Sequence, residues 1–302
     1  MLNAPAFFET ARERYSIKLR RDRGDAKPWS DDKAFQDYRF CNVFREDDTV
    51  TQWIRQRIGI PQWGKSTVGG IIVARWFNRI ETLEKLLCPA GEETYWRENL
   101  LYSWSDIGVW ANDGWSNRMR KRLANVKPLV TGAYIIKTPN GMNKLEGLIW
   151  SMEQVLPKAV ELQEEFAQEG YTLQRATERL AEFPFLGPFM AYEVATDLNY
   201  SVLKNAPDKY TWANPGPGCT RGIGRVAMGN PDVFNRGNKG DVKTMLALMA
   251  ELLDMANWSE HWHPEWPEWD MRTVEHWLCE FDKHQRIHLG EGRPKQTYNG
   301  VK

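Results

Sequence analysis

Two carboxylates in the segment GPFMAYEVATDLNYS (187–201) have a spacing that suits acid–base chemistry. Glu193 and Asp197 lie four residues apart. In a helix this spacing puts both side chains on one face, one turn apart. A carboxylate in such a position can accept a proton from a substrate. The same spacing also fits a non-catalytic role, either as a carboxylate stabilised by the helix dipole or as part of a buried structural ion pair.

The glycine-rich segment NPGPGCTRGIGR (214–225) could bind an anion. Glycines allow backbone N–H groups to converge in a nest, and arginines add positive charge. The candidate anion-binding residues here are Asn214, Gly216, Gly218, Arg221 and Arg225. A connecting loop with glycines at its turns is the alternative interpretation.

Two further segments carry polar residues at helical or capping spacing. In YRFCNVFREDD (38–48) polar side chains recur every three or four residues between aromatic ones, which predicts a largely buried helix with one polar stripe. A solvated helix face would give a similar stripe. The stripe consists of Arg39, Asn42, Arg45 and Asp48.

The segment TPNGMNK (138–144) reads as a helix start, where N–H groups can bind phosphate. Its candidate phosphate-binding residues are Asn140 and Lys144, with Asn143 beside them. A helix N-cap alone would account for Asn140.

The segment GIPQWGKS (59–66) matches the phosphate-loop pattern, but its context argues against a nucleotide site. A phosphate loop needs a buried strand before it. The preceding DDTVTQWIRQRI (47–58) reads as a charged amphipathic helix instead. Pro61 also removes a backbone donor from the loop. We therefore expect no ATP site here.

Composition describes an ordinary globular chain. The 302 residues are 42% hydrophobic and 26% charged, with a formal net charge of zero, so DNA contacts must come from local basic patches. No apolar run is long enough to cross a membrane, and the N-terminus lacks a signal-peptide core. Four scattered cysteines and five histidines show no standard zinc spacing, so we expect no metal.

Hydrophobic periodicity predicts a mainly α-helical fold with few short strands. Helices are expected over 143–166, 172–183, 241–258 and 270–287, and the best strand candidate is 132–138. Thr172 is placed to cap its helix. We expect a basic N-terminal arm (1–34), one catalytic domain (35–288) and a flexible tail (289–302).

A helix–turn–helix hairpin is predicted around FPFLGP (183–188). Pro188 suits a first helical position and Gly187 permits the turn before it. The segment resembles the helix-hairpin-helix of DNA glycosylases, with Phe185 in place of that motif's first glycine. The catalytic lysine and aspartate of those enzymes have Phe189 and Asn214 as their nearest counterparts, so the resemblance does not extend to glycosidic-bond cleavage.

Five separated blocks, in order, resemble the phage thymine-hypermodification family. They are residues 38–53, 131–147, 187–201, 214–223 and 274–283. The family comprises α-glutamyl/putrescinyl-thymine pyrophosphorylases (amino acid:DNA transferases) and is related to the helical domain of hydroxymethyluracil DNA kinases. Kinase members carry phosphorylation on a separate domain, which we do not find in this sequence.

The resemblance implies a glycosylase-like helical transferase acting on phage DNA. A free amino acid or polyamine would displace pyrophosphate from 5-pyrophosphoryloxymethyl-uracil, after the base is flipped into a pocket. Asp197 or Glu193 would accept the amine's proton and Arg221 would stabilise the pyrophosphate. Arg39, Asn42, Arg45, Asn140, Lys144, Gly187, Asn214, Gly216, Gly218 and Arg225 would bind DNA or pyrophosphate.

Several expectations accompany this hypothesis. No resident cofactor is required, although a magnesium ion could accompany the pyrophosphate. We expect a monomer without membrane contact, in the cytoplasm of an infected bacterial host. A DNA glycosylase for a modified base and a non-catalytic helix-hairpin-helix DNA-binding protein are the alternatives.

Overall fold

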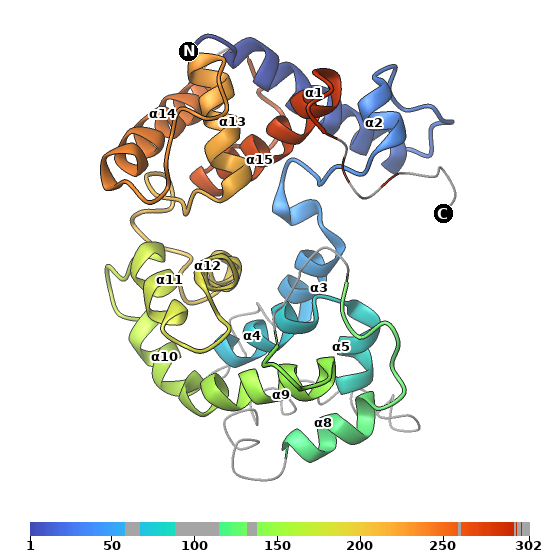
Figure 1. The fold of residues 1–302 in the computed structure, drawn as a ribbon, viewed down its shortest axis with the longest axis vertical. Coiled ribbons are helices and arrows are strands. Elements are labelled where there is room, and N and C mark those ends of the chain that lie inside the picture. Colours follow the sequence, from blue (N-terminus) through green and yellow to red (C-terminus); the bar gives the residue numbers. More distant parts are fainter. Residues whose placement is uncertain are drawn as a thin grey trace. The chain divides into compact units, whose positions relative to one another are not determined.

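The computed structural model describes residues 1–57, 67–87, 115–131, 138–258, 261–292, 294 and 297 (Figure 1). Their regular secondary structure is helical, and the only extended pairing among them is an isolated antiparallel bridge between Tyr38 and Thr297. The prediction of a mainly α-helical fold is confirmed. The phosphate-loop-like segment 59–66 and residues 132–137 of the strand candidate lie outside the described residues. No helix in the described part is long and apolar enough to cross a membrane.

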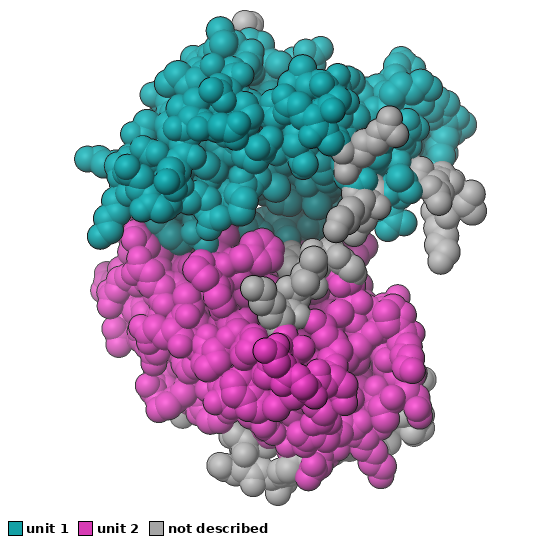
Figure 2. Space-filling view, in the orientation of Figure 1, with its two compact units in different colours: residues 1–48, 209–302 teal, residues 49–208 magenta. Residues whose placement is uncertain are grey.

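The chain forms two compact units, which Figure 2 distinguishes by colour. Unit 1 comprises residues 1–48 and 209–302, and unit 2 comprises residues 49–208. Unit 1 is therefore built from both ends of the sequence.

Unit 1 contains five α-helices and one 3-10 helix within its described residues. They are α1 (Ala4–Asp22), α2 (Lys33–Asp37), η1 (Arg45–Asp47), α13 (Pro217–Met228), α14 (Lys239–Trp258) and α15 (Met271–His288). Helix α15 packs against α13, α14, α1 and α2. Its N-terminus is capped by Asp270, which accepts a hydrogen bond from the Thr273 N–H group at 2.8 Å.

Aromatic side chains form the core of unit 1. Phe7 of α1 contacts Trp269 and Phe281 edge-on, with ring centroids 5.8 and 5.7 Å apart. Trp277 is fully buried and donates a hydrogen bond to the carbonyl of Phe7. The residues expected to form an N-terminal arm thus include a helix whose aromatic face lies inside this core.

The tryptophans of the C-terminal region differ in burial. Trp262, Trp269 and Trp277 are buried and Trp266 is half-buried, whereas Trp258, at the end of α14, is 87% exposed. Trp258 is therefore not part of the core.

Unit 2 is a second set of packed helices. Its elements are α3 (Thr49–Arg57), α4 (Thr67–Phe77), α5 (Ile80–Leu87), α8 (Trp115–Leu123), α9 (Lys144–Val155), η3 (Leu156–Lys158), α10 (Ala159–Phe166), α11 (Leu173–Ala181), α12 (Pro188–Asp197) and η4 (Leu198–Tyr200). Every residue of α4 is buried, and this helix packs against α5, α9, α10 and α12.

The described elements flanking residues 59–66 also bear on the phosphate-loop question. Helix α3 ends at Arg57 and helix α4 begins at Thr67. A phosphate loop joins a strand to a helix. A helix before the segment supports the conclusion that the match to the pattern is fortuitous.

Candidate functional site

The predicted helical hairpin is present in unit 2. Helices α11 and α12 pack against each other, joined by a short turn. Thr172 caps α11 by accepting a hydrogen bond from the Arg175 N–H group at 3.1 Å, as predicted. Gly187 is the N-cap of α12, and Pro188 occupies the first turn. The hairpin presents the exposed residues Gly187, Pro188 and Phe189 at its tip.

Phe185 adopts the left-handed backbone conformation in the hairpin turn. Its φ is 64°, a value that costs a non-glycine residue free energy. The helix-hairpin-helix pattern has a glycine at this position. The Phe185 ring packs edge-on against Trp150, with centroids 5.5 Å apart, and this contact offsets part of the backbone cost.

Asp197 forms a buried ion pair with Arg75. The guanidinium of Arg75 donates to both carboxylate oxygens, through Nε to Oδ2 and through Nη2 to Oδ1, the latter at 2.8 Å. Arg75 also donates to Asn78 and to Thr51 Oγ1, at 3.0 and 2.9 Å. The side chains of Arg75 and Asp197 are 2% and 0% exposed. A buried ion pair, one of the arrangements that the spacing allowed, is therefore present at Asp197.

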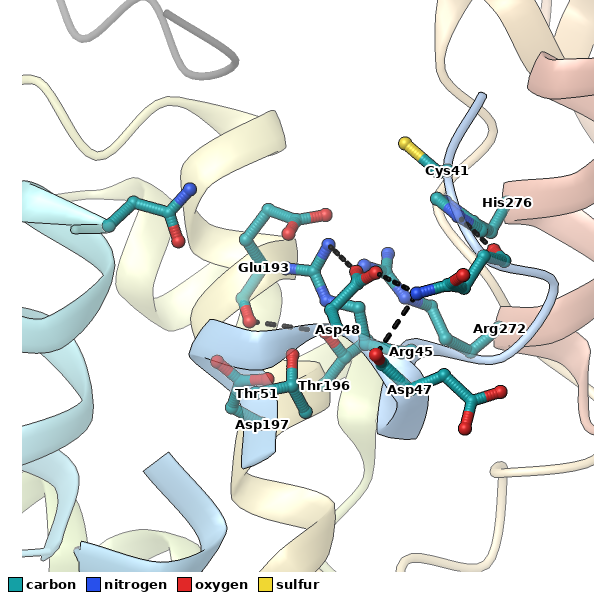
Figure 3. Close-up of polar contacts among 12 residues, drawn as sticks. Cys41, Arg45, Asp47, Asp48, Thr51, Glu193, Thr196, Asp197, Arg272 and His276 are labelled. Atoms are coloured by element: carbon teal, nitrogen blue, oxygen red, sulfur yellow. Dashed lines mark hydrogen bonds and ion pairs between the residues drawn. The ribbon is translucent and has the colours of Figure 1, made fainter. Parts of the chain in front are cut away.

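Glu193 lies one turn before Asp197 on α12 and is buried (Figure 3). Its backbone carbonyl accepts a hydrogen bond from Thr196 Oγ1 at 3.1 Å. Its carboxylate is not part of the Arg75 pair.

Segment 138–144, the other predicted phosphate-binding segment of unit 2, has a different helix cap from the one considered in the sequence analysis. Asn143, and not Asn140, caps α9, because its Oδ1 accepts from the Glu146 N–H group at 3.0 Å. Asn140 is exposed in the preceding turn. Lys144 is the first residue of α9, and partial burial lowers the pKa of its ammonium group. It lies at the end of the helix where anions bind favourably.

The glycine-rich segment forms helix α13 in unit 1, which corrects the prediction of an exposed nest or loop. A Cβ atom at Gly222 would lie 2.1 Å from the Leu278 carbonyl oxygen, and one at Gly218 would lie 2.3 Å from Cys279 Sγ. These glycines therefore allow α13 to approach α15 closely. The N–H group of Gly216 donates to Glu275 Oε1 at 3.3 Å. Asn214 lies in the half-buried stretch before the helix.

The two arginines of α13 belong to an ion-pair cluster. Arg225 Nε lies 2.8 Å from Asp282 Oδ1, and its Nη2 contacts Glu291. Arg221 Nε lies 3.3 Å from the same Asp282 carboxylate. Arg286 contacts the other Asp282 oxygen at 3.1 Å. Carboxylates thus already compensate the charge of Arg221 and Arg225, and the Arg221 side chain stays 35% exposed.

The segment 38–48 is irregular and ends in a 3-10 turn, so the predicted helix over these residues is wrong. Several of its polar groups form hydrogen bonds with other elements instead. The Cys41 N–H group donates to Glu280 Oε2 at 2.9 Å, and Arg14 Nη2 donates to Asn42 Oδ1 at 2.7 Å. Burial would raise the pKa of Glu280, but Lys283, His276 and the Cys41 N–H group outweigh this effect and lower it.

The polar stripe is nevertheless brought together partly at the end of this segment (Figure 3). Asn42 Nδ2 donates to the Asp47 carbonyl at 3.0 Å and to Asp48 Oδ1 at 3.2 Å. Arg45 is buried and pairs with Asp48 at 3.8 Å. Arg39 is exposed. The Asn42 carbonyl contacts His276 Nε2 at 3.1 Å, and burial lowers the pKa of that imidazole.

The candidate residues divide between the two units. Unit 2 contains Glu193, Asp197, Gly187, Asn140 and Lys144. Unit 1 contains Arg39, Asn42, Arg45, Asn214, Gly216, Gly218, Arg221 and Arg225. Arg75 is the residue that the sequence analysis missed. A single arginine inside the apolar run TVGGIIVARWF was the available signal, because a buried charge requires a partner.

The fold and the site define a class of protein. The described part of the chain is all-helical, contains the α11–α12 hairpin and has buried ion pairs between arginines and carboxylates. Residues 3–293 match the family described as 5-hmdU DNA kinase, helical domain, and the chain belongs to that family. It is also similar to the 5-hmdU DNA kinase of Bacillus phage SP10, with 26% identity over 322 residues. The alignment covers 97% of this chain and 48% of the phage protein, so the chain spans about half the length of this relative. No solved structure matches.

Proposed function

We propose that this protein is a DNA-modifying transferase of a phage thymine-hypermodification pathway. An amine, either an amino acid or a polyamine, attacks the methylene carbon of 5-pyrophosphoryloxymethyl-uracil in DNA. The carbon–oxygen bond breaks, pyrophosphate leaves with the electron pair, and the amine nitrogen loses a proton to a carboxylate. The observation that carries this proposal is the family match, which extends over residues 3–293.

The family supplies the substrate context of the proposal. The relative's name denotes an enzyme that phosphorylates 5-hydroxymethyl-deoxyuridine in DNA. Phosphorylation of that hydroxymethyl group makes it a better leaving group, and a transferase is the class of enzyme that consumes such an activated base.

Contacts in unit 2 favour Glu193 as the base. An α-amino group has a pKa of about 8, so it must lose a proton to become a nucleophile at neutral pH. Asp197 has both oxygens bound by Arg75, and protonation would disrupt that pair. Glu193 is buried on the same helix, one turn before Asp197, and we assign it as the base. In this proposal, Asp197 and Arg75 hold α12 in place.

The hairpin supplies the DNA contact in this proposal. The first N–H groups of a helix have no intrahelical acceptors and favour anions. At α12 they begin beside the exposed tip residues Gly187 and Pro188. Lys144, at the start of α9 in the same unit, is the cation we assign to the pyrophosphate.

The decisive experiment combines the full chain with DNA that contains 5-pyrophosphoryloxymethyl-uracil and a mixture of amino acids and polyamines. We expect amine-dependent release of pyrophosphate and a new nucleoside whose mass equals base plus amine, measured by mass spectrometry after digestion. DNA with 5-hydroxymethyl-uracil is the matched control and should not react.

Three other outcomes would contradict the proposal. Abasic sites in the treated DNA would identify a glycosylase. Phosphorylation of 5-hydroxymethyl-uracil by ATP would identify a kinase. Binding without turnover under any amine mixture would identify a DNA-binding protein.

A further inference from the structure

Three side chains that could bind a metal converge in unit 1, and none of them is among the residues assigned to the transferase. Asp32 comes from the N-cap of α2, and His284 and His288 from the last turns of α15. One ligand atom from each residue lies within 4.8 Å of the others. His284 Nε2 is 2.7 Å from Asp32 Oδ2, and His288 Nε2 is 3.2 Å from Asp32 Oδ1.

We propose that Asp32, His284 and His288 bind a divalent first-row transition metal ion, with zinc as the preferred probe. Imidazole nitrogens and a carboxylate oxygen are ligands that such ions take in proteins. The proposal does not depend on the transferase activity.

The distance between the two imidazoles suits a shared ion. His284 Nε2 and His288 Nε2 are 3.2 Å apart. Two nitrogens bound at tetrahedral angles, with bonds of about 2.0–2.1 Å, lie about 3.3 Å from each other. The spacing of four residues on one helix places both rings on the same face. Little movement of either side chain is needed for both lone pairs to reach one ion.

Two of the three ligands, Asp32 and His284, are held in position by neighbouring groups. Asp32 Oδ1 accepts from the Ala34 N–H group at 2.7 Å, and the Asp32 N–H group donates to Ser30 Oγ at 3.1 Å. The His284 ring is buried and packs against Phe35, with centroids 5.1 Å apart. A site whose side chains are fixed before binding loses less conformational entropy when the ion arrives.

A cavity of about 870 Å³ adjoins the three residues, all of its lining being in unit 1. Its walls include Glu9, Glu13, Arg20, Trp29, Asp31 and Trp266. Three protein ligands leave a tetrahedral ion one position for water, and the cavity provides access to it. Nδ1 of His284 is buried and has no hydrogen-bond partner among the described residues. With Nε2 on the ion, Nδ1 would carry the ring proton, which fixes the tautomer of His284.

Sequence spacing could not reveal this site. Asp32 and His284 are 252 positions apart in the chain, so no compact ligand motif exists. The expectation of no metal rested on the absence of such a motif.

The test is calorimetric titration of zinc into the full, tag-free chain after treatment with a chelator. We expect one zinc per chain in the wild type. His288→Gln and Asp32→Asn should each weaken binding at least tenfold. The His288 side chain is 46% exposed, and asparagine can keep the cap of α2, so both variants should fold. When cobalt is bound in place of zinc, the protein should show the visible absorption of a tetrahedral cobalt ion.

Two control variants sharpen the result. Asp31→Asn removes a carboxylate from the same cavity wall, and His263→Gln removes an exposed imidazole elsewhere in unit 1. Both should bind zinc as the wild type does. The proposal is wrong if the wild type binds neither zinc nor cobalt, or if His288→Gln and Asp32→Asn bind as tightly as the wild type.

Discussion

At the scale of single residues, the Arg75–Asp197 pair gives different roles to two carboxylates that look equivalent in the sequence. Both are on α12 and both are buried. Asp197 is bound at both oxygens by a guanidinium, a strong charge-assisted arrangement. A proton acceptor must be able to change charge during the reaction. Protonation of Asp197 would disrupt its pair with Arg75, so we assign proton acceptance to Glu193.

The first prediction concerns Glu193. Glu193→Gln keeps the size of the side chain but cannot accept a proton, so amine transfer should slow by about 100- to 10,000-fold. Single-turnover pyrophosphate release from modified DNA would measure this loss. Helical content and DNA affinity should match the wild type. Transfer at the wild-type rate would exclude Glu193 as the base.

The second prediction concerns Asp197. Asp197→Asn leaves the charge of Arg75 buried without compensation, and such a change typically costs about 3–5 kcal/mol of unfolding free energy. Urea unfolding of the variant would measure the loss. The opposite result, full stability with abolished transfer, would make Asp197 the base and assign Glu193 a structural role.

At the scale of elements, the sequence predicted helices well where the residues that start or end a helix are adjacent to it in the chain. Thr172 caps α11 as expected from its position before an amphipathic run. The helix expected over 143–166 is present as α9 and α10, separated at Leu156–Lys158, where proline interrupts the pattern.

Predictions failed where distant residues decide the local structure. Segment 38–48 has helical periodicity, but Glu280, 239 positions away, binds its backbone in an irregular conformation. Helix α13 is rich in glycine, which disfavours helices, yet close packing on α15 outweighs that propensity. The site shows the same limit: sequence identified Asp197 but could not identify its partner, which is 122 positions away.

The third prediction tests the hairpin as a DNA-binding element. A Cβ at Gly187 would have no atom within 4 Å, so Gly187→Val should fold and should place its side chain at the α12 N-terminus. Binding to modified and unmodified DNA should weaken about equally, because phosphate contacts carry no sequence information. Fluorescence anisotropy at several salt concentrations would measure both affinities. Gly237→Val, in an exposed loop of unit 1, is the control, and equal affinities of the two variants would place the DNA surface elsewhere.

The fourth prediction isolates the backbone cost at Phe185. Phe185→Ala and Phe185→Gly both lose the ring contact with Trp150, but only glycine accepts a φ of 64° without strain. The glycine variant should therefore be more stable than the alanine variant by about 1 kcal/mol. Thermal unfolding of both would measure this difference. Equal stabilities would mean that the turn relaxes when the ring is removed.

At the scale of the whole molecule, unit 1 is discontinuous in sequence and unit 2 is continuous. Composition and periodicity describe neighbouring residues, so they could not show that residues 1–48 pack with residues 209–302. The Asn3 side chain illustrates this long-range assembly: its Nδ2 donates to the Arg225 carbonyl at 2.8 Å, across 222 positions.

The fifth prediction follows from the place of α1 in unit 1. A variant lacking residues 1–22 loses Phe7 and Phe8, both fully buried, and removal of one such ring typically costs about 3–5 kcal/mol. Amide hydrogen exchange in α13 and α15 should become much faster, while exchange in α4 and α12 of unit 2 stays slow. Unchanged protection in α13 and α15 would mean that α1 is dispensable, as expected of a free arm.

The split of unit 1 also sets an order of events on the ribosome. Helix α1 is synthesised early, but its partners α13 and α15 follow about two hundred residues later, after the whole of unit 2. Synthesis proceeds at about 5–20 residues per second, so the aromatic face of α1 stays exposed for roughly 10–50 s before its partners are made. Unit 2 can fold during that interval. Until then the nascent chain exposes the aromatic face of residues 4–22, and chaperone binding to this segment is the expected consequence.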